Sequence, residues 1–239
     1  MEEISVTEKE YNQSNLLYVQ TAMSELFRYS ECSKRLYVSD GRAKLVITCS
    51  KDYFDLIHAE LCDKVSEIIA IKYKYDYFKK NVQIGGLSSV EKELLLTSLI
   101  SADLDDDKKY SFDRIKQSVE IAVDGIYDFR LRPLKNKWRD VAGYIPTCFL
   151  SGQLKEFVSY LIENKKKRVY VDNGRVYDWH YRLLKRSSLL DGEKVKIVRE
   201  ILLSNCGEVE LSGDIPKDDE YYLKEFFNDK IIFSGRYFN

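Results

Sequence analysis

Residues 113–130 read DRIKQSVEIAVDGIYDFR, and residues 168–181 read RVYVDNGRVYDWHY. In the first segment the apolar residues recur every three or four positions: Ile115, Val119, Ala122, Ile126 and Phe129. That spacing places side chains on one face of a helix. In the second segment, runs of valine and tyrosine flank Asn173-Gly174, a dipeptide typical of a two-residue hairpin turn. The middle of the chain is therefore predicted to run from a helix over 113–130 towards a β-hairpin.

The N-terminal part carries the same two signals in a different order. Residues 16–27 have the spacing of a short amphipathic helix, and strand-like runs on either side of Asp40-Gly41 predict a first hairpin. We expect an αββ unit there. Residues 51–80 then keep apolar side chains, Ile68 among them, at spacings of three or four. One helix over this range would be roughly 45 Å long, at ~1.5 Å per residue.

The remaining segments are predicted from caps, breakers and short periodic runs. Ser88 with Glu91 fits a capping box, and Pro133 marks a break, a kink or the first turn of a new helix. Near the C-terminus a strand, a helix and a strand are expected over 209–211, 221–227 and 231–233. So short a crossover suggests a small parallel βαβ unit.

Together these patterns predict an α+β fold that is predominantly helical, with two β-hairpins and a small C-terminal βαβ unit. We expect a helix/hairpin/long-helix region over 1–110 and a helical middle with the hairpin and the βαβ unit over 111–239. One continuous domain also fits the 239 residues. Residues 35–42 and 168–175 share five identities in eight positions, which arise either from an internal duplication or from hairpin chemistry alone.

Composition limits the class of protein. Hydrophobic residues make up 44% and charged residues 32% of the chain, with only three prolines, as in a well-ordered globular protein. No run approaches the roughly 18 apolar residues of a membrane helix, so we do not expect an integral membrane protein. The start Met1-Glu2-Glu3 lacks the basic lead of a signal peptide, and we expect a cytoplasmic location.

Metal and catalytic motifs give little support to an enzyme. The five cysteines contain no Cys-x-x-Cys pair, which favours reduced, mostly buried thiols over a disulfide framework or a zinc ribbon. Residues 103–107 hold four acids whose spacing fits no EF-hand, so a solvated loop or a helix N-terminus is expected. His58 and Cys62 lie four residues apart on one helix and could both bind a metal, but two ligands alone do not make a site. His180 beside Asp178 is either a general base or a packed or surface aromatic corner. No cofactor and no metal are predicted.

The charges are distributed unevenly. The net charge is −1, but residues 130–186 carry 14 basic and 5 acidic side chains, a block of +9 between acidic flanks. Basic residues neutralise phosphates and aromatic residues stack on bases, so this block is the candidate binding segment. Its candidate residues are Arg130, Arg132, Lys135, Lys137, Trp138, Lys165, Lys166, Lys167, Arg168, Arg175, Trp179 and His180. Arg182, Lys185 and Arg186 continue the basic run.

The chain resembles the YtxC-like family of sporulation proteins of endospore-forming Firmicutes. The resemblance rests on residues 50–54 before the long helix, Phe129-Arg130-Leu131, residues 154–158, Val176-Tyr177-Asp178, residues 201–204, and the ending 209–213 with 231–235. Family members tend to end in a cysteine-containing cluster, whereas this chain ends Gly235-Arg-Tyr-Phe-Asn239. The resemblance implies a cytoplasmic, sporulation-linked protein without a settled activity.

Two functions follow as the main hypotheses, and an unrecognised enzyme ranks third. The first is a non-enzymatic binding or scaffold protein, associated with sporulation, in which the basic block pairs with the acidic flanks inside the chain or with a partner protein or second copy. The second is a module that uses the block over 130–186 to bind nucleic acid or another anionic surface. A sequence pI near 6.2 is low for a nucleic-acid-binding domain and favours the first hypothesis.

Overall fold

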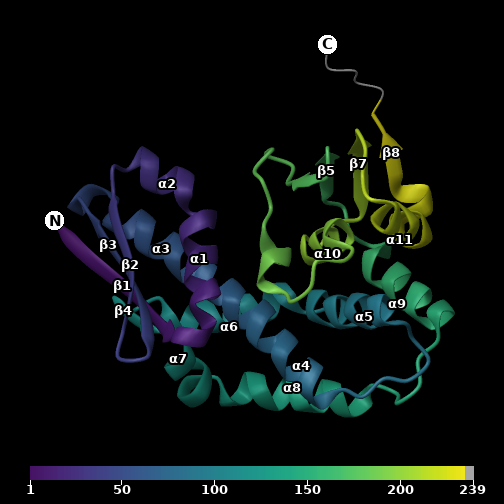
Figure 1. The fold of residues 1–239 in the computed structure, drawn as a ribbon, viewed down its shortest axis with the longest axis horizontal. Helices are drawn as coiled ribbons and strands as arrows, with labels where there is room; N and C mark the ends of the chain where they lie inside the picture. Colours follow the sequence, from purple (N-terminus) through teal and green to yellow (C-terminus); the bar gives the residue numbers. More distant parts are fainter. Residues whose placement is uncertain (235–239) are drawn as a thin grey trace. The chain divides into compact units, whose positions relative to one another are not determined.

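The computed structural model describes residues 1–234 and divides into two compact units that are interleaved in sequence (Figure 1). Unit 1 comprises residues 1–74 and 105–143, and unit 2 comprises residues 75–104 and the described chain from 144 onward. Each unit combines helices with a four-stranded sheet. The α+β, predominantly helical fold class is thereby confirmed. The sequence suggested a division near residue 110, whereas the chain passes between the units three times.

Unit 1 is built on the sheet β2-β3-β1-β4, in which β1 runs antiparallel to β3 and parallel to β4. Its strands are β1 (Glu2–Lys9), β2 (Ser33–Ser39), β3 (Arg42–Cys49) and β4 (Glu120–Ala122). Its helices are η1 (Glu10–Asn12), α1 (Gln13–Ala22), α2 (Ser24–Tyr29), α3 (Lys51–Glu67), η2 (Ile68–Tyr73), α6 (Leu104–Ile115), α7 (Val123–Arg130) and α8 (Arg132–Tyr144).

The N-terminal hairpin forms as predicted. Asp40 and Gly41 both have positive φ angles, 53° and 72°, as a type I′ turn requires. The αββ prediction was incomplete, because residues 2–9 form strand β1 in front of the helix. The charged sequence EEISVTEK hid this strand, although Ile4 and Val6 are fully buried.

The prediction of one helix over 113–130 was wrong. Helix α6 ends at Ile115, and residues 120–122 add β4 to the edge of β1, with Ile121 opposite Val6. Helix α7 starts only at Val123. Two residues of the expected buried face, Val119 and Phe129, are consequently 47% and 86% exposed. The apparent helical period arose because apolar residues of α6, the loop after it, β4 and α7 happen to be spaced three or four positions apart.

The long helix over 51–80 is present with an irregularity. Helix α3 continues through η2, a π-helical segment, into α4 (Lys74–Asn81). A π segment inserts extra backbone without ending the helix, so the apolar spacing persists through it. Ile68 is fully buried, as expected. No helix among the described residues is long and apolar enough to cross a membrane.

Unit 2 is built on the sheet β6-β5-β7-β8. Its strands are β5 (Arg168–Asp172), β6 (Arg175–Tyr177), β7 (Glu208–Ser212) and β8 (Ile231–Phe233). Its helices, besides α4, are α5 (Ser89–Ser101), α9 (Ser151–Glu163), η3 (Arg186–Leu189), α10 (Lys196–Leu203), α11 (Lys217–Phe227) and η4 (Asn228–Lys230). The second hairpin, the parallel β7-α11-β8 unit and the Ser88–Glu91 capping box are all confirmed.

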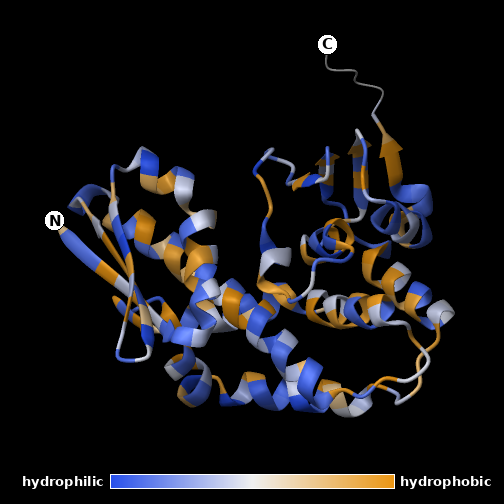
Figure 2. Cartoon of the chain, in the orientation of Figure 1, coloured by the Kyte–Doolittle hydropathy of each residue, from blue (hydrophilic) through white to orange (hydrophobic). Residues whose placement is uncertain are grey.

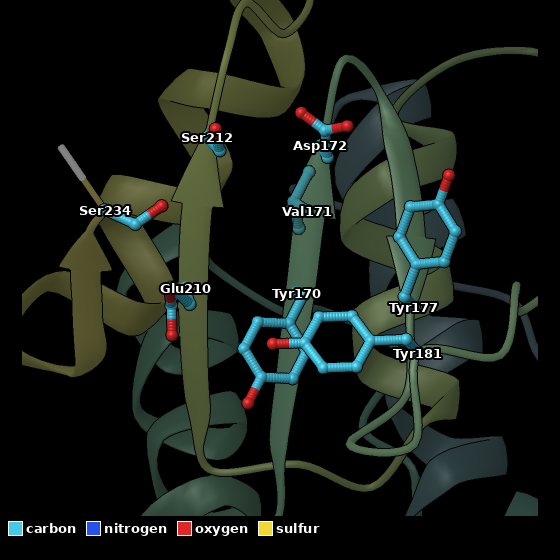
Figure 3. Close-up of a pocket in the computed structure, with 8 residues that line it drawn as sticks. All are labelled: Tyr170, Val171, Asp172, Tyr177, Tyr181, Glu210, Ser212 and Ser234. Carbon is cyan, nitrogen blue, oxygen red and sulfur yellow. The ribbon is translucent and has the colours of Figure 1, made fainter. Parts of the chain in front are cut away.

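The two faces of this second sheet differ. Val169, Val171, Val176 and Val209 are buried in a core with apolar residues of α5, α9, α10 and α11. Figure 2 shows these helices as alternating apolar and polar bands. The side chains between these valines, such as Tyr170 and Glu210, belong to the opposite face. Figure 3 looks onto that face, with helices behind the sheet.

The two hairpins are not placed equivalently. In unit 1 the strand after the turn, β3, lies inside the sheet, whereas in unit 2 the strand before the turn, β5, lies inside. This difference favours independent hairpin chemistry over internal duplication. Residues 235–239, where the chain departs from the cysteine-containing end of the resembled family, lie outside the described residues.

Candidate anion-binding site

A pocket of about 150 Å³ in unit 2 brings together part of the predicted basic and aromatic segment. It is lined by the start of β5, the loop after β6, η3 and the end of α10. Four of its lining side chains are basic and one is acidic: Lys167, Arg168, Arg182, Arg186 and Asp178. Trp179 completes the rim and is 59% exposed. This group of residues is called the basic pocket below.

The loop after β6 is held in place by Asp178. Its carboxylate accepts hydrogen bonds from the backbone N–H groups of His180 and Arg182, each at 2.9 Å, and from Nε of Arg182 at 2.8 Å. Partial burial raises the pKa of Asp178, but the hydrogen bonds from Arg182 and His180 outweigh it and hold the pKa below its usual value. Asp178 therefore stays ionised and fixes Arg182 at the pocket.

A buried carboxylate, that of Glu200, holds the part of the pocket formed by η3 and α10. Glu200 on α10 accepts the backbone N–H groups of Arg186 at 2.9 Å and Ser187 at 2.6 Å. Burial raises the pKa of Glu200 despite these hydrogen bonds. The Arg186 guanidinium also donates to the carbonyl oxygen of Leu203 at 3.0 Å. The backbone of η3 and the base of Arg186 are thus fixed relative to α10.

The positive charge of the pocket is only partly compensated. Arg168 pairs with Glu208 at 2.8 Å, and Arg182 pairs with Asp178 at 2.8 Å. Within the described part of the chain, the ammonium groups of Lys165, Lys166 and Lys167 make no hydrogen bond or ion pair. These three consecutive lysines precede β5 and lead into the pocket. Because Arg168–Glu208 and Arg182–Asp178 are ion pairs, the positive charge that an anion would meet here comes chiefly from the three lysines.

The rim is aromatic. The rings of Trp179 and His180 lie 3.3 Å apart between centroids, at an interplanar angle of 36°. Both residues are exposed, so the indole is available to stack on a planar group. The nearest carboxylate, Asp178, is engaged by Arg182 and by backbone N–H groups. Trp179 and His180 thus form an exposed aromatic pair at the rim.

The other predicted binding residues lie elsewhere. Arg130, Arg132, Lys135, Lys137 and Trp138 belong to unit 1 and do not line the basic pocket. Trp138 is fully buried, and its Nε1 donates to Asp107 at 2.8 Å, so the prediction of Trp138 as a binding residue that stacks on a ligand was wrong. Lys137 also pairs with Asp107. Arg175 is exposed at the turn of the second hairpin.

The acidic run over 103–107 and the pair His58 and Cys62 make contacts within the fold. The run over 103–107 does begin a helix, with three aspartates in the first turn of α6. Asp107, however, is buried rather than solvated. His58 Nε2 lies 2.9 Å from the carbonyl oxygen of Ser118 and 3.6 Å from the Cys62 sulfur. Among residues 1–234, no three potential metal ligands lie close enough together to hold an ion.

Sequence reasoning named the cations and the tryptophan of the pocket but not Glu200 or Ser204. The named residues that line it are Lys167, Arg168, Asp178, Trp179, Arg182 and Arg186. Asp178 lies in the loop after β6, whereas Glu200 lies on α10 and Ser204 directly follows the last residue of that helix. One local signal was present: Asp178 and Arg182 are four residues apart in the loop after the hairpin, a spacing at which their side chains can pair. Comparisons with family models, with curated proteins and with solved structures found no match.

Proposed function

We propose that this protein is a binding protein whose basic pocket takes a phosphate group of a single-stranded nucleic acid. The observation that carries the proposal is the convergence of Lys167, Arg168, Arg182 and Arg186 beside an exposed tryptophan. Guanidinium groups form paired hydrogen bonds with phosphate oxygens, and indole rings stack on bases. Phosphate contact supplies the affinity, and stacking on Trp179 adds to it without selecting a sequence.

The size of the pocket supports a polymer rather than a whole small molecule. Pockets that enclose drug-sized ligands measure roughly 300–1,000 Å³. At about 150 Å³, the basic pocket has room for one phosphate and its sugar, while the rest of the ligand lies outside. The lysines at 165–167 extend the positive surface beyond the pocket, which suits a neighbouring phosphate.

A second candidate is a protein scaffold, and a specific observation favours it. Several cations of the basic block are paired within their own unit: Lys137 with Asp107, Lys155 with Glu225, and Arg168 with Glu208. In this alternative the lysines at 165–167 contact an acidic partner protein or a second copy. A link to sporulation, implied by the resemblance to YtxC-like proteins, is part of either proposal.

Trp179 provides the test. Fluorescence of the protein is followed during titration with a 12-nucleotide single-stranded RNA at several salt concentrations. If about three phosphates are contacted, the log–log slope of affinity against salt should be about −2, at ~0.7 per contact. Trp138 is buried in unit 1, so the change in fluorescence on addition of RNA should disappear in Trp179→Phe.

Charge reversal then separates the two candidates. Lys165→Glu, Lys166→Glu and Lys167→Glu together should abolish RNA binding. Lys80→Glu, Lys194→Glu and Lys217→Glu form the matched control, because these exposed lysines of unit 2 lie outside the pocket and carry the same change of charge. Two results together would favour the scaffold. The unmodified protein would not bind RNA at about 50 mM salt, and the triple variant at 165–167 would alter assembly or stability.

A further inference from the structure

The face of the second sheet that is opposite to the helical core carries a hollow of about 190 Å³ that differs chemically from the basic pocket. Its lining includes three tyrosines and two carboxylates: Tyr170, Tyr177, Tyr181, Asp172 and Glu210. Figure 3 shows the rings of Tyr170 and Tyr181 overlapping, with Tyr177 to one side, Asp172 above and Glu210 on the far side. All of these residues belong to unit 2.

The tyrosine wall is held by an unusual backbone. The rings of Tyr170 and Tyr181 are stacked, with centroids 4.5 Å apart and an interplanar angle of 19°. Tyr181 has a φ of +59°, a left-handed conformation that is unfavourable for a residue with a side chain. The backbone hydrogen bonds Asp178 N to Arg182 O and Tyr181 N to Asp178 O close the loop around it. The loop therefore keeps the Tyr181 ring over Tyr170 at a cost in backbone energy.

The hollow is negatively charged. None of its lining residues is basic, and two are carboxylates. Arg168 approaches Glu210 at 3.5 Å, but it also pairs with Glu208 at 2.8 Å, so the Arg168–Glu208 pair is neutral and Asp172 and Glu210 retain a charge of −2. Asp172 accepts one hydrogen bond, from the side chain of Asn173 at 3.1 Å. Phosphate would be repelled here, whereas a cation would be attracted.

We infer that this hollow binds an organic cation, specifically a primary alkylammonium group. The faces of tyrosine rings attract cations, and their apolar surface accommodates the alkyl stem. The carboxylates, with the hydroxyls of Ser212 and Ser234, offer acceptors for the three N–H donors of the ammonium group. Such a group occurs both in free polyamines and on lysine side chains. The ligand differs from the phosphate proposed for the basic pocket, although Arg168 and the loop over 178–182 border both sites.

The ligand class is tested with small probes and amide NMR. Butylammonium should shift the amide resonances of residues 170–172 and 210–212, whereas the uncharged analogue 1-butanol should bind at least about fivefold more weakly. Tetramethylammonium, which has no N–H donor, should also bind more weakly than butylammonium. Comparison of spermidine with the peptide acetyl-Gly-Lys-Gly-amide distinguishes a free polyamine from a lysine side chain as the source of the group.

Two variants locate the site. Tyr181→Asn keeps a residue that tolerates the left-handed backbone and removes the ring, and Glu210→Gln removes one charge without changing shape. Each should weaken butylammonium about two- to fivefold. The controls Tyr160→Leu and Glu163→Gln are exposed residues of α9, outside the hollow, and should leave affinity unchanged.

Three results would overturn the inference. They are butanol binding as tightly as butylammonium, tetramethylammonium binding more tightly than butylammonium, and resonance shifts confined to residues outside the hollow. Shifts at 167–168, 178–179 and 182–186 with RNA report on the basic pocket instead. A failure of butylammonium to bind therefore leaves the RNA proposal standing, and a failure of RNA to bind leaves the alkylammonium inference standing.

Discussion

At the scale of single residues, Asp107 shows how a buried charge is accommodated. Its carboxylate receives hydrogen bonds from Lys74, Lys137 and Trp138, each at 2.8 Å. Asp107 and Lys74 are each only 1% exposed at the side chain, so this ion pair is fully buried. A buried ion pair adds little net stability, but loss of one partner leaves the other charge desolvated.

Replacement of Asp107 by alanine should therefore lower the free energy of unfolding by about 3–5 kcal/mol. The measurement is urea denaturation followed by the fluorescence of Trp138, whose hydrogen-bond acceptor is removed in the same variant. Asp106→Ala is the control, because the neighbouring Asp106 is exposed on the same helix turn and should change stability by less than about 0.5 kcal/mol. Equal effects of the two substitutions would contradict this account of Asp107.

The sequence could not reveal this cluster. Lys74, Asp107 and Trp138 are separated by more than 30 residues from one another, and an acidic run is ordinarily solvated. The same limit applies to the basic pocket, where the run 165–168 was visible. Glu208, which pairs with Arg168, and Glu200, which accepts the backbone N–H groups of η3, were not. Trp138 was assigned to the wrong role because a tryptophan among basic residues has the same local pattern whether it is buried or exposed. Tertiary placement alone separates these cases.

At the scale of elements, turns were predicted better than helix boundaries. Asp40-Gly41 and Asn173-Gly174 were sufficient for both hairpins, because few residue pairs adopt positive φ twice in succession. The apparent helix over 113–130 failed since β4 has only three residues, too few to show an alternation of its own. Strand β1 was missed because its exposed positions are charged.

Helix α7 offers a direct test of the corrected boundary. Ile126 is 5% exposed and Phe129, three residues later, is 86% exposed. Ile126→Ala should cost about 2–5 kcal/mol of unfolding free energy, whereas Phe129→Ala should change it by no more than about 0.5 kcal/mol. Thermal and urea denaturation measure both. A large cost for Phe129→Ala would restore the continuous helix that the periodicity suggested.

At the scale of the whole molecule, the thiols differ by environment. All five cysteines are free, with Cys148 exposed and Cys49, Cys62 and Cys206 buried. Burial raises the pKa of Cys62 and of Cys206 to about 11 in each case. Because the thiolate is the reactive form, these two side chains are protected both by burial and by protonation.

Alkylation at pH 8 should accordingly label Cys148 first. For a pKa near 11, roughly one thiol in a thousand is ionised at pH 8, so Cys62 and Cys206 should react only on unfolding. Mass spectrometry of peptides after a short pulse of iodoacetamide gives the order. Raising the pH to 9 should increase thiolate at Cys62 and Cys206 about tenfold while the fold persists. Rapid labelling of Cys206 in the folded protein would disagree with its position in the core.

The interleaving of the two units sets an order of events on the ribosome. Residues 1–143 contain every segment of unit 1, so that unit is complete while unit 2 consists only of residues 75–104. Helix α5 in this segment later packs against α9 and α10. Roughly ninety further residues must be synthesised before β8 completes the second sheet, which takes some 5–20 s at about 5–20 residues per second. During that interval Leu94 and Leu95, buried in the finished protein, present an apolar surface to which a chaperone can bind.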